Sequence, residues 1–210
     1  WLEFRRVLFR SGLGGGTGTG AAAIIAKAAK EIGALTVSVV TKPFTWEGKK
    51  RAGLANLGLE ELKKVSDSII IVPNDRLLEI IDENVGMKDA FKIIDNILYQ
   101  AVNGMSEVIL NPGNSDINTD FADVKTIMQH KGMALMGIGR AKGENAAQRA
   151  LEDAIDSPLL DKVSLNGAKG ILIHFNIHPQ VSLFAINDVM GTINDRMDSN
   201  AEIIFGTTSD

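Results

Sequence analysis

The stretch that decides the fold is Gly14–Gly20, with the sequence GGGTGTG, which leads into a run of alanine and isoleucine from Ala21 to Ile32. These twelve positions are rich in strong helix formers, and Gly33 stands where a helix-ending glycine is common. Backbone amides at the N-terminus of a helix attract anions, and glycines let phosphate oxygens approach them closely. Five glycines in seven residues are costly to order, so the stretch predicts a phosphate-binding loop rather than a simple turn.

Two common phosphate-binding motifs fit this loop poorly. A Walker A loop needs a lysine after its last glycine, but an alanine follows Gly20. A dinucleotide-binding fingerprint can be placed on Gly16 and Gly18. It needs an acidic residue at the end of the next strand, where this chain has Thr41 and Lys42. A Rossmann-type NAD(P) oxidoreductase, with Lys42 near a 2′-phosphate, is kept as an alternative.

Short β-branched runs alternate with helical patterns along the chain. This alternation predicts an α/β fold with a largely parallel first sheet. We expect a Rossmann-like parallel-sheet domain, a long central helix at 87–105 and a smaller α+β C-terminal domain. Strands are expected at 35–41, 68–73, 134–139, 170–175 and 202–205. Helices are expected at 21–32, 47–57, 59–65, 87–105, 121–129, 145–155 and 183–196, with a further helix capped by Asn74 and Asp75.

Composition excludes several classes of protein. The 210 residues contain no cysteine, which rules out disulfides, Cys-ligated zinc and a Cys nucleophile. The net charge of −4 argues against a nucleic-acid partner. No apolar run approaches the ~18 residues of a membrane span, so no direct membrane insertion is expected. His174 and His178 have no carboxylate nearby in the sequence, and no protein-ligated metal is predicted.

The N-terminal segment 1–11 (WLEFRRVLFRS) has no starting Met, no helix cap and no clear link to the glycine stretch after it. Arginines interrupt its apolar residues, so it does not read as a signal peptide. We interpret it as a non-native leader and leave it out of the predicted fold.

Further motifs downstream point to one family. They are VVTKPF at 39–44, EGKKR at 47–51, PND at 73–75, NTDFADV at 118–124, SPLL at 157–160 and FGT at 205–207. Together with GGGTGTG they resemble the tubulin/FtsZ superfamily, and the chain is identified as a member of its bacterial cell-division family. The resemblance runs from Gly14 to Asp210 and implies a GTP-binding domain at 12–116 and a C-terminal domain at 117–210. It also implies truncation at both ends, with the first strands of the sheet and the last strands of the C-terminal domain missing.

The resemblance implies GTP or GDP as the ligand, with Mg²⁺ held mostly by water and nucleotide oxygens. Thr41 would lie near the nucleotide, Asn74 would touch the ribose or base, and Glu47 with Arg51 would contact ribose and phosphate. A surface ion pair is the plainer interpretation of Glu47 and Arg51, which are one helical turn apart. The residues implied at the phosphates are Gly15, Gly16, Thr17, Gly18, Thr19 and Gly20.

Phe91 and Asp95 are the implied guanine contacts. Because they stand at i and i+4 of a predicted helix, they share a face. A carboxylate suits guanine, which offers two adjacent donors, and so favours GTP over ATP. Ordinary core packing is the alternative for Phe91.

Asn118, Asp120 and Asp123 are the implied catalytic residues. Two carboxylates three positions apart at the start of a helix lie on one face, where they could orient water for phosphoryl transfer. In the family this loop completes the active site of the neighbouring subunit. The alternative for these residues is that Asp120 caps the helix and Asp123 is solvated. A non-hydrolysing filament scaffold is kept as a further alternative for the chain, although the pair of carboxylates argues against it.

The resemblance further implies a head-to-tail homopolymer, the division (Z) ring, in the cytoplasm at mid-cell. Division proteins and membrane tethers would bind through a C-terminal tail that is absent here. Because missing strands would leave a parallel sheet edge uncovered, we expect the isolated chain to aggregate and to hydrolyse GTP weakly.

Overall fold

A computed structural model describes residues 6–79, 81, 84–110, 121–128, 133–157, 159–160 and 167–209. The chain forms two compact units, one of Trp1–Asn103 with Met128–Leu135 and one of Gly104–Ile127 with Met136–Asp210. The domain boundary expected at 116/117 lies outside the described residues and stays a prediction. The elements are β1 (Arg6–Gly12), α1 (Gly16–Glu31), β2 (Leu35–Lys42), η1 (Thr45–Glu47), α2 (Lys49–Val65), β3 (Ser68–Pro73), α3 (Asn74–Leu77), α4 (Met87–Leu110), α5 (Phe121–Met128), β4 (Met133–Ala134), α6 (Ala146–Ile155), β5 (Gly170–Ile177), α7 (Leu183–Asp195) and β6 (Glu202–Ser209).

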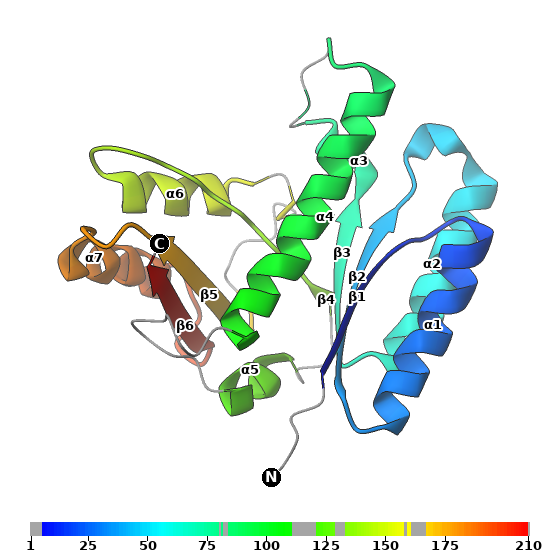
Figure 1. Ribbon diagram of the computed structural model, residues 1–210, viewed down its shortest axis with the longest axis horizontal. Helices are drawn as coiled ribbons and strands as arrows, with labels where there is room; N and C mark the ends of the chain where they lie inside the picture. Colours follow the sequence, from blue (N-terminus) through cyan, green and yellow to red (C-terminus); the bar gives the residue numbers. More distant parts are fainter. Residues whose placement is uncertain are drawn as a thin grey trace. The chain divides into compact units, whose positions relative to one another are not determined.

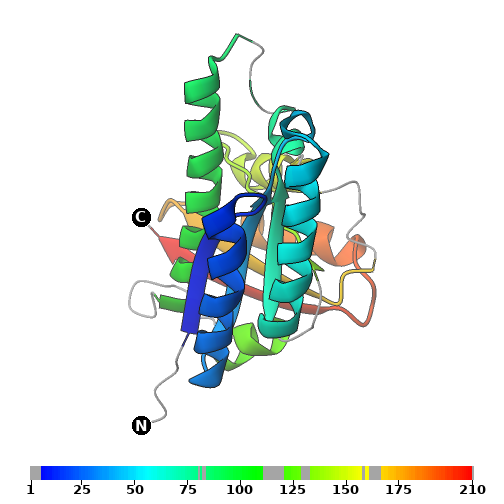
Figure 2. The same cartoon turned by 90° about the vertical axis from the view of Figure 1, so that its right-hand side faces the viewer.

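The first unit is built on a parallel four-stranded sheet in the order β1-β2-β3-β4. Helices α1 and α2 pack against each other on one face of this sheet (Figure 1) and lie side by side in front of the strands in Figure 2. Nearly every residue of β2 and β3 is buried, as is typical of central parallel strands covered by helices. The predicted parallel α/β arrangement is confirmed. Its core contains Leu13, Ala22, Ala26, Val40, Ala55, Leu59, Leu62, Ile69 and Ile71.

Residues 6–11 differ from our expectation, because they belong to strand β1. The strand pairs with β2 along its whole length, from Arg6 opposite Leu35 to Gly12 opposite Thr41. Backbone pairing needs only an extended chain, and the Phe9 side chain also packs against the core. The non-native origin of the segment stays a hypothesis, but its exclusion from the fold does not hold for residues 6–11.

Two helices differ from the predicted pattern in an informative way. Helix α1 begins at Gly16 rather than Ala21, so most of the glycine stretch forms its first turns. Helix α2 is continuous through Gly58, where two helices were expected. A Cβ at Gly58 would lie 2.5 Å from Thr19 Cγ2, so this glycine permits close packing of α1 and α2 and does not end a helix.

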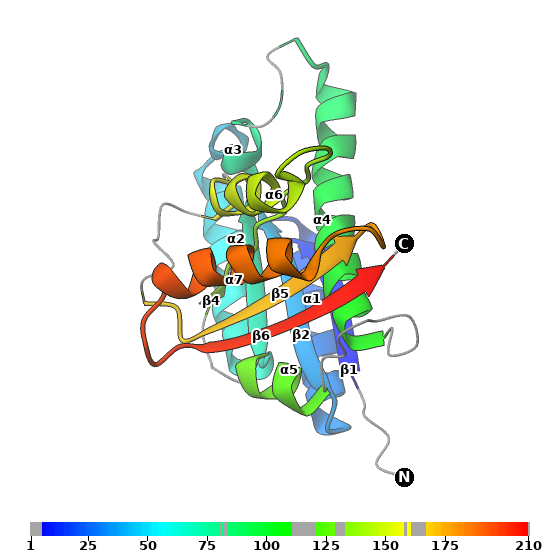
Figure 3. The same cartoon turned by 90° about the vertical axis from the view of Figure 1, so that its left-hand side faces the viewer.

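The second unit pairs two parallel strands, β5 and β6, from Gly170 opposite Glu202 to Ile177 opposite Ser209. Helices α6 and α7 lie side by side, and α7 covers one face of the strand pair (Figure 3).

The strand expected at 134–139 is reduced to the two residues of β4. Beyond it, Gly139 approaches α6 so closely that an added Cβ would lie 1.8 Å from Ala150 O, and the segment packs on a helix instead of extending the ladder.

Among the described residues, no helix is long and apolar enough to cross a membrane. The other helices and strands predicted for the second unit form within a few residues of their expected bounds. Asn145 precedes α6 in a left-handed conformation, and the Ser182 side chain caps α7 by accepting a hydrogen bond from the Ala185 amide at 3.2 Å.

Candidate functional site

The carboxyl ends of β1, β2 and β3 meet at one edge of the sheet. Gly12 stands opposite Thr41, and Thr41 stands opposite Val72. The Leu13 amide continues the pairing by donating to Thr41 O at 3.0 Å. The connections after the three strands therefore begin side by side, at the edge where α/β sheets place their ligands. Thr41 itself is buried at this edge, 6% exposed.

Two glycines of the glycine stretch are required by the fold itself. Gly14 has a φ of +100°, and an added Cβ would lie 3.1 Å from Arg51 O. At Gly18 a Cβ would lie 2.2 Å from Gly12 O, so the first turn of α1 sits directly against the end of β1. Thr19 closes this turn, because its hydroxyl oxygen accepts a hydrogen bond from the Gly14 amide at 2.9 Å.

Three other glycines of the stretch face open space. A Cβ at Gly15, Gly16 or Gly20 would meet nothing within 4 Å. Gly15 precedes the first residue of α1, and it has no side chain that could cap the free backbone amides of the helix's first turn. The first turn of α1 also carries no acidic side chain. The N-terminus of this 16-residue helix therefore presents backbone donors and the positive end of its dipole without a competing anion.

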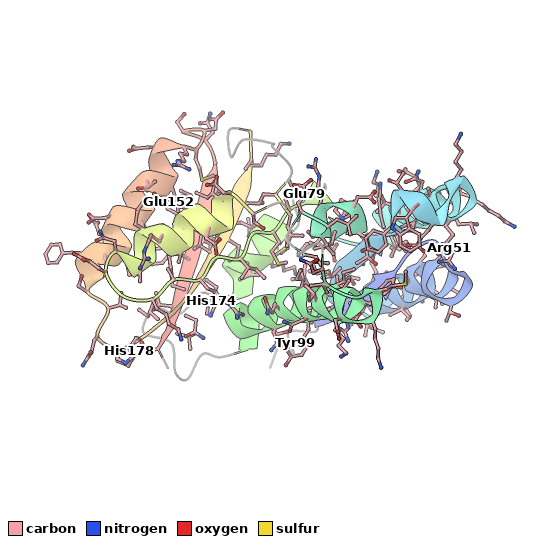
Figure 4. All side chains as sticks on the ribbon, turned by 90° about the horizontal axis from the view of Figure 1, so that it is seen from above. Arg51, Glu79, Tyr99, Glu152, His174 and His178 are labelled. Carbon is pink, nitrogen blue, oxygen red and sulfur yellow. The ribbon has the colours of Figure 1, made fainter. Side chains whose placement is uncertain are left out.

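Glu47 and Arg51 form the ion pair considered as the plainer interpretation. Arg51 Nη1 donates to Glu47 Oε2, while Glu47 Oε1 accepts from the Phe44 amide at 2.9 Å. The Glu47 side chain is 13% exposed and that of Arg51 is 60% exposed. Figure 4 shows Arg51 where the N-terminal ends of α1 and α2 lie side by side. The pair thus stands at the edge of the glycine turn, with the guanidinium still open to solvent.

Asn74 does not cap α3 as expected. It is the first residue of that helix, and Pro73 precedes it in an extended conformation. Its side chain is buried, and its Oδ1 has no hydrogen-bond partner in the protein. Buried acceptors are nearly always satisfied, so this atom suits a donor supplied by a ligand.

Asp75, which was predicted only as part of a helix cap, lies inside α3 and binds the connection after β2. Its carboxylate accepts from the Thr45 amide at 2.9 Å and from the Thr45 hydroxyl at 2.6 Å. The only signal in the sequence is its place in the PND turn, which by itself suggests no partner thirty residues away.

An aromatic group connects α4 to the same edge. Phe44 is buried and stacks on Trp46 with ring centroids 5.2 Å apart, and it meets Phe91 edge-on at 6.0 Å. Phe91 is 43% exposed, so plain core packing does not describe it. Asp95 is exposed one turn further along α4, and its backbone oxygen accepts from Arg10 Nη1 at 3.2 Å. Sequence reasoning missed Phe44 as the partner of Phe91 and Trp46 as the ring stacked on Phe44.

Asn118 and Asp120 lie outside the described residues. Asp123 is the third residue of α5, but its side chain lies outside the described part as well. Their catalytic roles stay predictions.

Two of the three histidines, His174 and His178, lie within the described residues. His174 Nε2 lies 3.3 Å from Thr208 Oγ1 across the β5–β6 pair, and His178 Nδ1 accepts from the Gln180 amide (Figure 4). Within the described ranges, no three His, Asp or Glu side chains are grouped so that they could hold a metal ion.

Two family models match the sequence. Residues 3–82 match the GTPase domain of the tubulin/FtsZ family, and residues 132–210 match the C-terminal domain of the FtsZ family.

Solved structures give the same result. A structure of an empty FtsZ dimer from M. jannaschii is 46% identical, with a TM-score of 0.90 over 98% of this chain. A structure of CetZ1 from Haloferax volcanii, a GDP-bound monomer, is 19% identical with a TM-score of 0.76 over 99% of this chain, a likeness of fold alone. The chain spans 59% of the FtsZ chain and 61% of the CetZ1 chain.

Proposed function

Because this chain belongs to the tubulin/FtsZ family, we propose that it binds GTP or GDP at the carboxyl edge of its four-stranded sheet and hydrolyses GTP as a subunit of a head-to-tail polymer. The observation that carries the proposal is the first turn of α1. Its free amides, open glycines and lack of acidic side chains make it a site for an anion, and it lies where the three strands end.

The phosphate end of the nucleotide is assigned to this turn. The space over Gly15, Gly16 and Gly20 is where phosphate oxygens can approach the backbone. The exposed Thr17 hydroxyl is available as a donor, and Thr19 contributes by closing the turn. The helix dipole adds about 0.3–1 kcal/mol per favourable charge. Arg51 is close enough to the turn, through its backbone contact with Gly14, for its exposed guanidinium to reach a phosphate.

The ribose and base are assigned to the other two connections. Asn74 Oδ1 would accept from a ribose hydroxyl or a base amine and so gain the partner it lacks. Phe91 would cover one face of guanine, and the Asp95 carboxylate would accept from N1–H and the exocyclic amine. Glu47 contributes mainly by holding Phe44 and Arg51, since both of its oxygens are engaged by the chain.

Hydrolysis is assigned to Asn118, Asp120 and Asp123 acting on the nucleotide of the next subunit. The carboxylates of Asp120 and Asp123 would orient the attacking water, Asn118 would support the same loop, and the loop's position would depend on assembly. A bound Mg²⁺ would neutralise charge on the phosphates, held mostly by water and nucleotide oxygens. A contact that repeats head to tail without closing builds a filament. We place that filament in the cytoplasm, at the division site, where tethers and division proteins would bind a tail outside this sequence.

The test is GTP turnover per subunit measured against protein concentration. A shared active site predicts almost no turnover at low concentration and a rise above a threshold. Asp120→Ala is expected to abolish turnover while leaving GDP affinity unchanged, because it removes a carboxylate from the partner's side of the site. Turnover that is independent of concentration, or full turnover in Asp120→Ala, would contradict the shared site.

A competition assay separates the ligand classes. Fluorescent N-methylanthraniloyl-GDP (mant-GDP) should be displaced by GTP and GDP but not by ATP or NAD⁺. The family match does not favour the dinucleotide alternative, and preferential displacement by NAD⁺ would restore it.

A further inference from the structure

The connection after β2 is held in place by one side chain from the connection after β3. Asp75 receives two hydrogen bonds from Thr45, one from its amide at 2.9 Å and one from its hydroxyl at 2.6 Å. Hydrogen bonds to a charged acceptor are shorter and about twice as strong as neutral ones. Asp75 therefore joins two loops that are thirty residues apart in the sequence.

The turn held by Asp75 carries side chains that contact two residues assigned to the nucleotide, Phe91 and Arg51. Thr45 begins η1, so fixing its amide also fixes Phe44 before it and Trp46 and Glu47 after it. Phe44 contacts Phe91 edge-on, and Glu47 binds Arg51. A shift of this turn would move the aromatic contact and the guanidinium together.

We propose that Asp75 is a positioning residue for the nucleotide site, which sets the place of the Thr45–Glu47 turn without touching the nucleotide. This inference rests on the proposed function. Asp75 adjoins Asn74, whose buried Oδ1 has no hydrogen-bond partner in the protein. One short segment therefore supplies both the proposed ligand contact, Asn74, and the clamp, by which we mean the hydrogen bonds of Asp75 to Thr45 that fix the Thr45–Glu47 turn.

The chain contains a matched control at the opposite edge of the same sheet. Asp67 Oδ2 accepts from the Thr36 amide at 2.9 Å, and the Asp67 amide donates to Thr36 O at 2.9 Å. This pair also links the segments of β2 and β3, but at their amino ends, away from the glycine turn. Asp67→Asn and Asp75→Asn should therefore both loosen the sheet, and only Asp75→Asn should affect the ligand.

The experiment measures mant-GDP affinity in the full chain for the parent, Asp75→Asn, Thr45→Val, Thr45→Ser and Asp67→Asn. We expect about a tenfold loss of affinity in Asp75→Asn and Thr45→Val. Thr45→Ser, which keeps the hydroxyl, should bind like the parent, and so should Asp67→Asn. The double variant Thr45→Val/Asp75→Asn should lose little more affinity than either single variant, because both single changes disrupt the same contact between Thr45 and Asp75.

Trp46 provides a readout that needs no ligand. In a Trp1→Phe background it is the one tryptophan left, and it stacks on Phe44 within the clamped turn. Its steady-state anisotropy should fall in Asp75→Asn and stay unchanged in Asp67→Asn.

The outcomes separate the two ideas. Unchanged anisotropy and affinity in Asp75→Asn, or equal losses of affinity in Asp67→Asn and Asp75→Asn, would overturn the positioning role. Failure of the parent chain to bind mant-GDP would instead overturn the proposed function, and the Trp46 measurement would still report on the clamp.

Discussion

Two glycines of the same helical turn are expected to respond oppositely to alanine. Gly18→Ala should destabilise the fold, because the new Cβ would lie 2.2 Å from Gly12 O and 2.9 Å from Ser11 Oγ. Gly16→Ala meets no atom within 4 Å and should leave the fold intact. Both residues lie in α1 without a positive φ, so backbone strain does not distinguish them.

The magnitude follows from two opposing terms. Replacing a helical glycine by alanine gains up to about 1 kcal/mol from helix propensity. Overpacking typically costs about 1–3 kcal/mol, and the upper part of that range applies because the clash at Gly18 is with backbone. Gly18→Ala should therefore lose roughly 1–2 kcal/mol of unfolding free energy, equivalent to a fall in Tm of about 2–8 °C for a chain of this size.

The assay combines urea denaturation, followed by far-UV circular dichroism, with mant-GDP titration. Gly16→Ala should unfold at the parent's urea midpoint or above it, yet bind at least about tenfold more weakly, since its methyl group would occupy space assigned to phosphate. Equal stability of Gly16→Ala and Gly18→Ala would refute the packing argument. Unchanged binding by Gly16→Ala would refute the phosphate assignment.

Three further predictions test packing and binding elsewhere. Gly58→Ala should cost about 1–3 kcal/mol, since its Cβ would lie 2.5 Å from Thr19 Cγ2, and Thr19→Ser, which lacks that methyl, should restore most of the loss in a urea double-mutant cycle. Asn74→Ala should weaken mant-GDP binding about tenfold, one hydrogen bond's worth, with little change in urea midpoint because Oδ1 has no protein partner; an unchanged affinity would remove Asn74 from the site. Gly139→Ala should destabilise the second unit by at least about 2 kcal/mol, because its Cβ would lie 1.8 Å from Ala150 O, and hydrogen exchange should localise the loss to α6.

The sequence predicted that the glycine stretch leads into a helix, because that prediction depends on local chemistry, and phosphate binding by the turn stays a prediction. Glycines followed by helix formers indicate free amides at a helix start wherever the helix lies in the fold. The exact start of α1 was wrong by five residues, since Gly16, Thr17 and Gly18 adopt helical conformation despite their low propensity. Packing of that turn against β1 outweighs the intrinsic preference.

Only part of the candidate base site was predicted from the sequence. The family resemblance implied Phe91 and Asp95 together, and their i, i+4 spacing is consistent with a shared helix face. The contact of Phe91 with Phe44 depends on how α4 meets the connection after β2, and no local sequence pattern predicts it. The split of α2 at Gly58 was wrong for the same reason, since only the neighbouring helix reveals why the glycine is there.

By itself the sequence determined most of the alternating helices and strands, the glycine stretch that leads into α1 and the family, because these depend on short-range propensity, periodicity and motif. Only the tertiary structure decided that residues 6–11 add a strand to the sheet and that Asp75 holds Thr45. It alone also showed that Asn74 is buried with an unpartnered oxygen. These features depend on the register of parallel strands, which brings together residues some thirty positions apart through backbone pairing that no local pattern encodes.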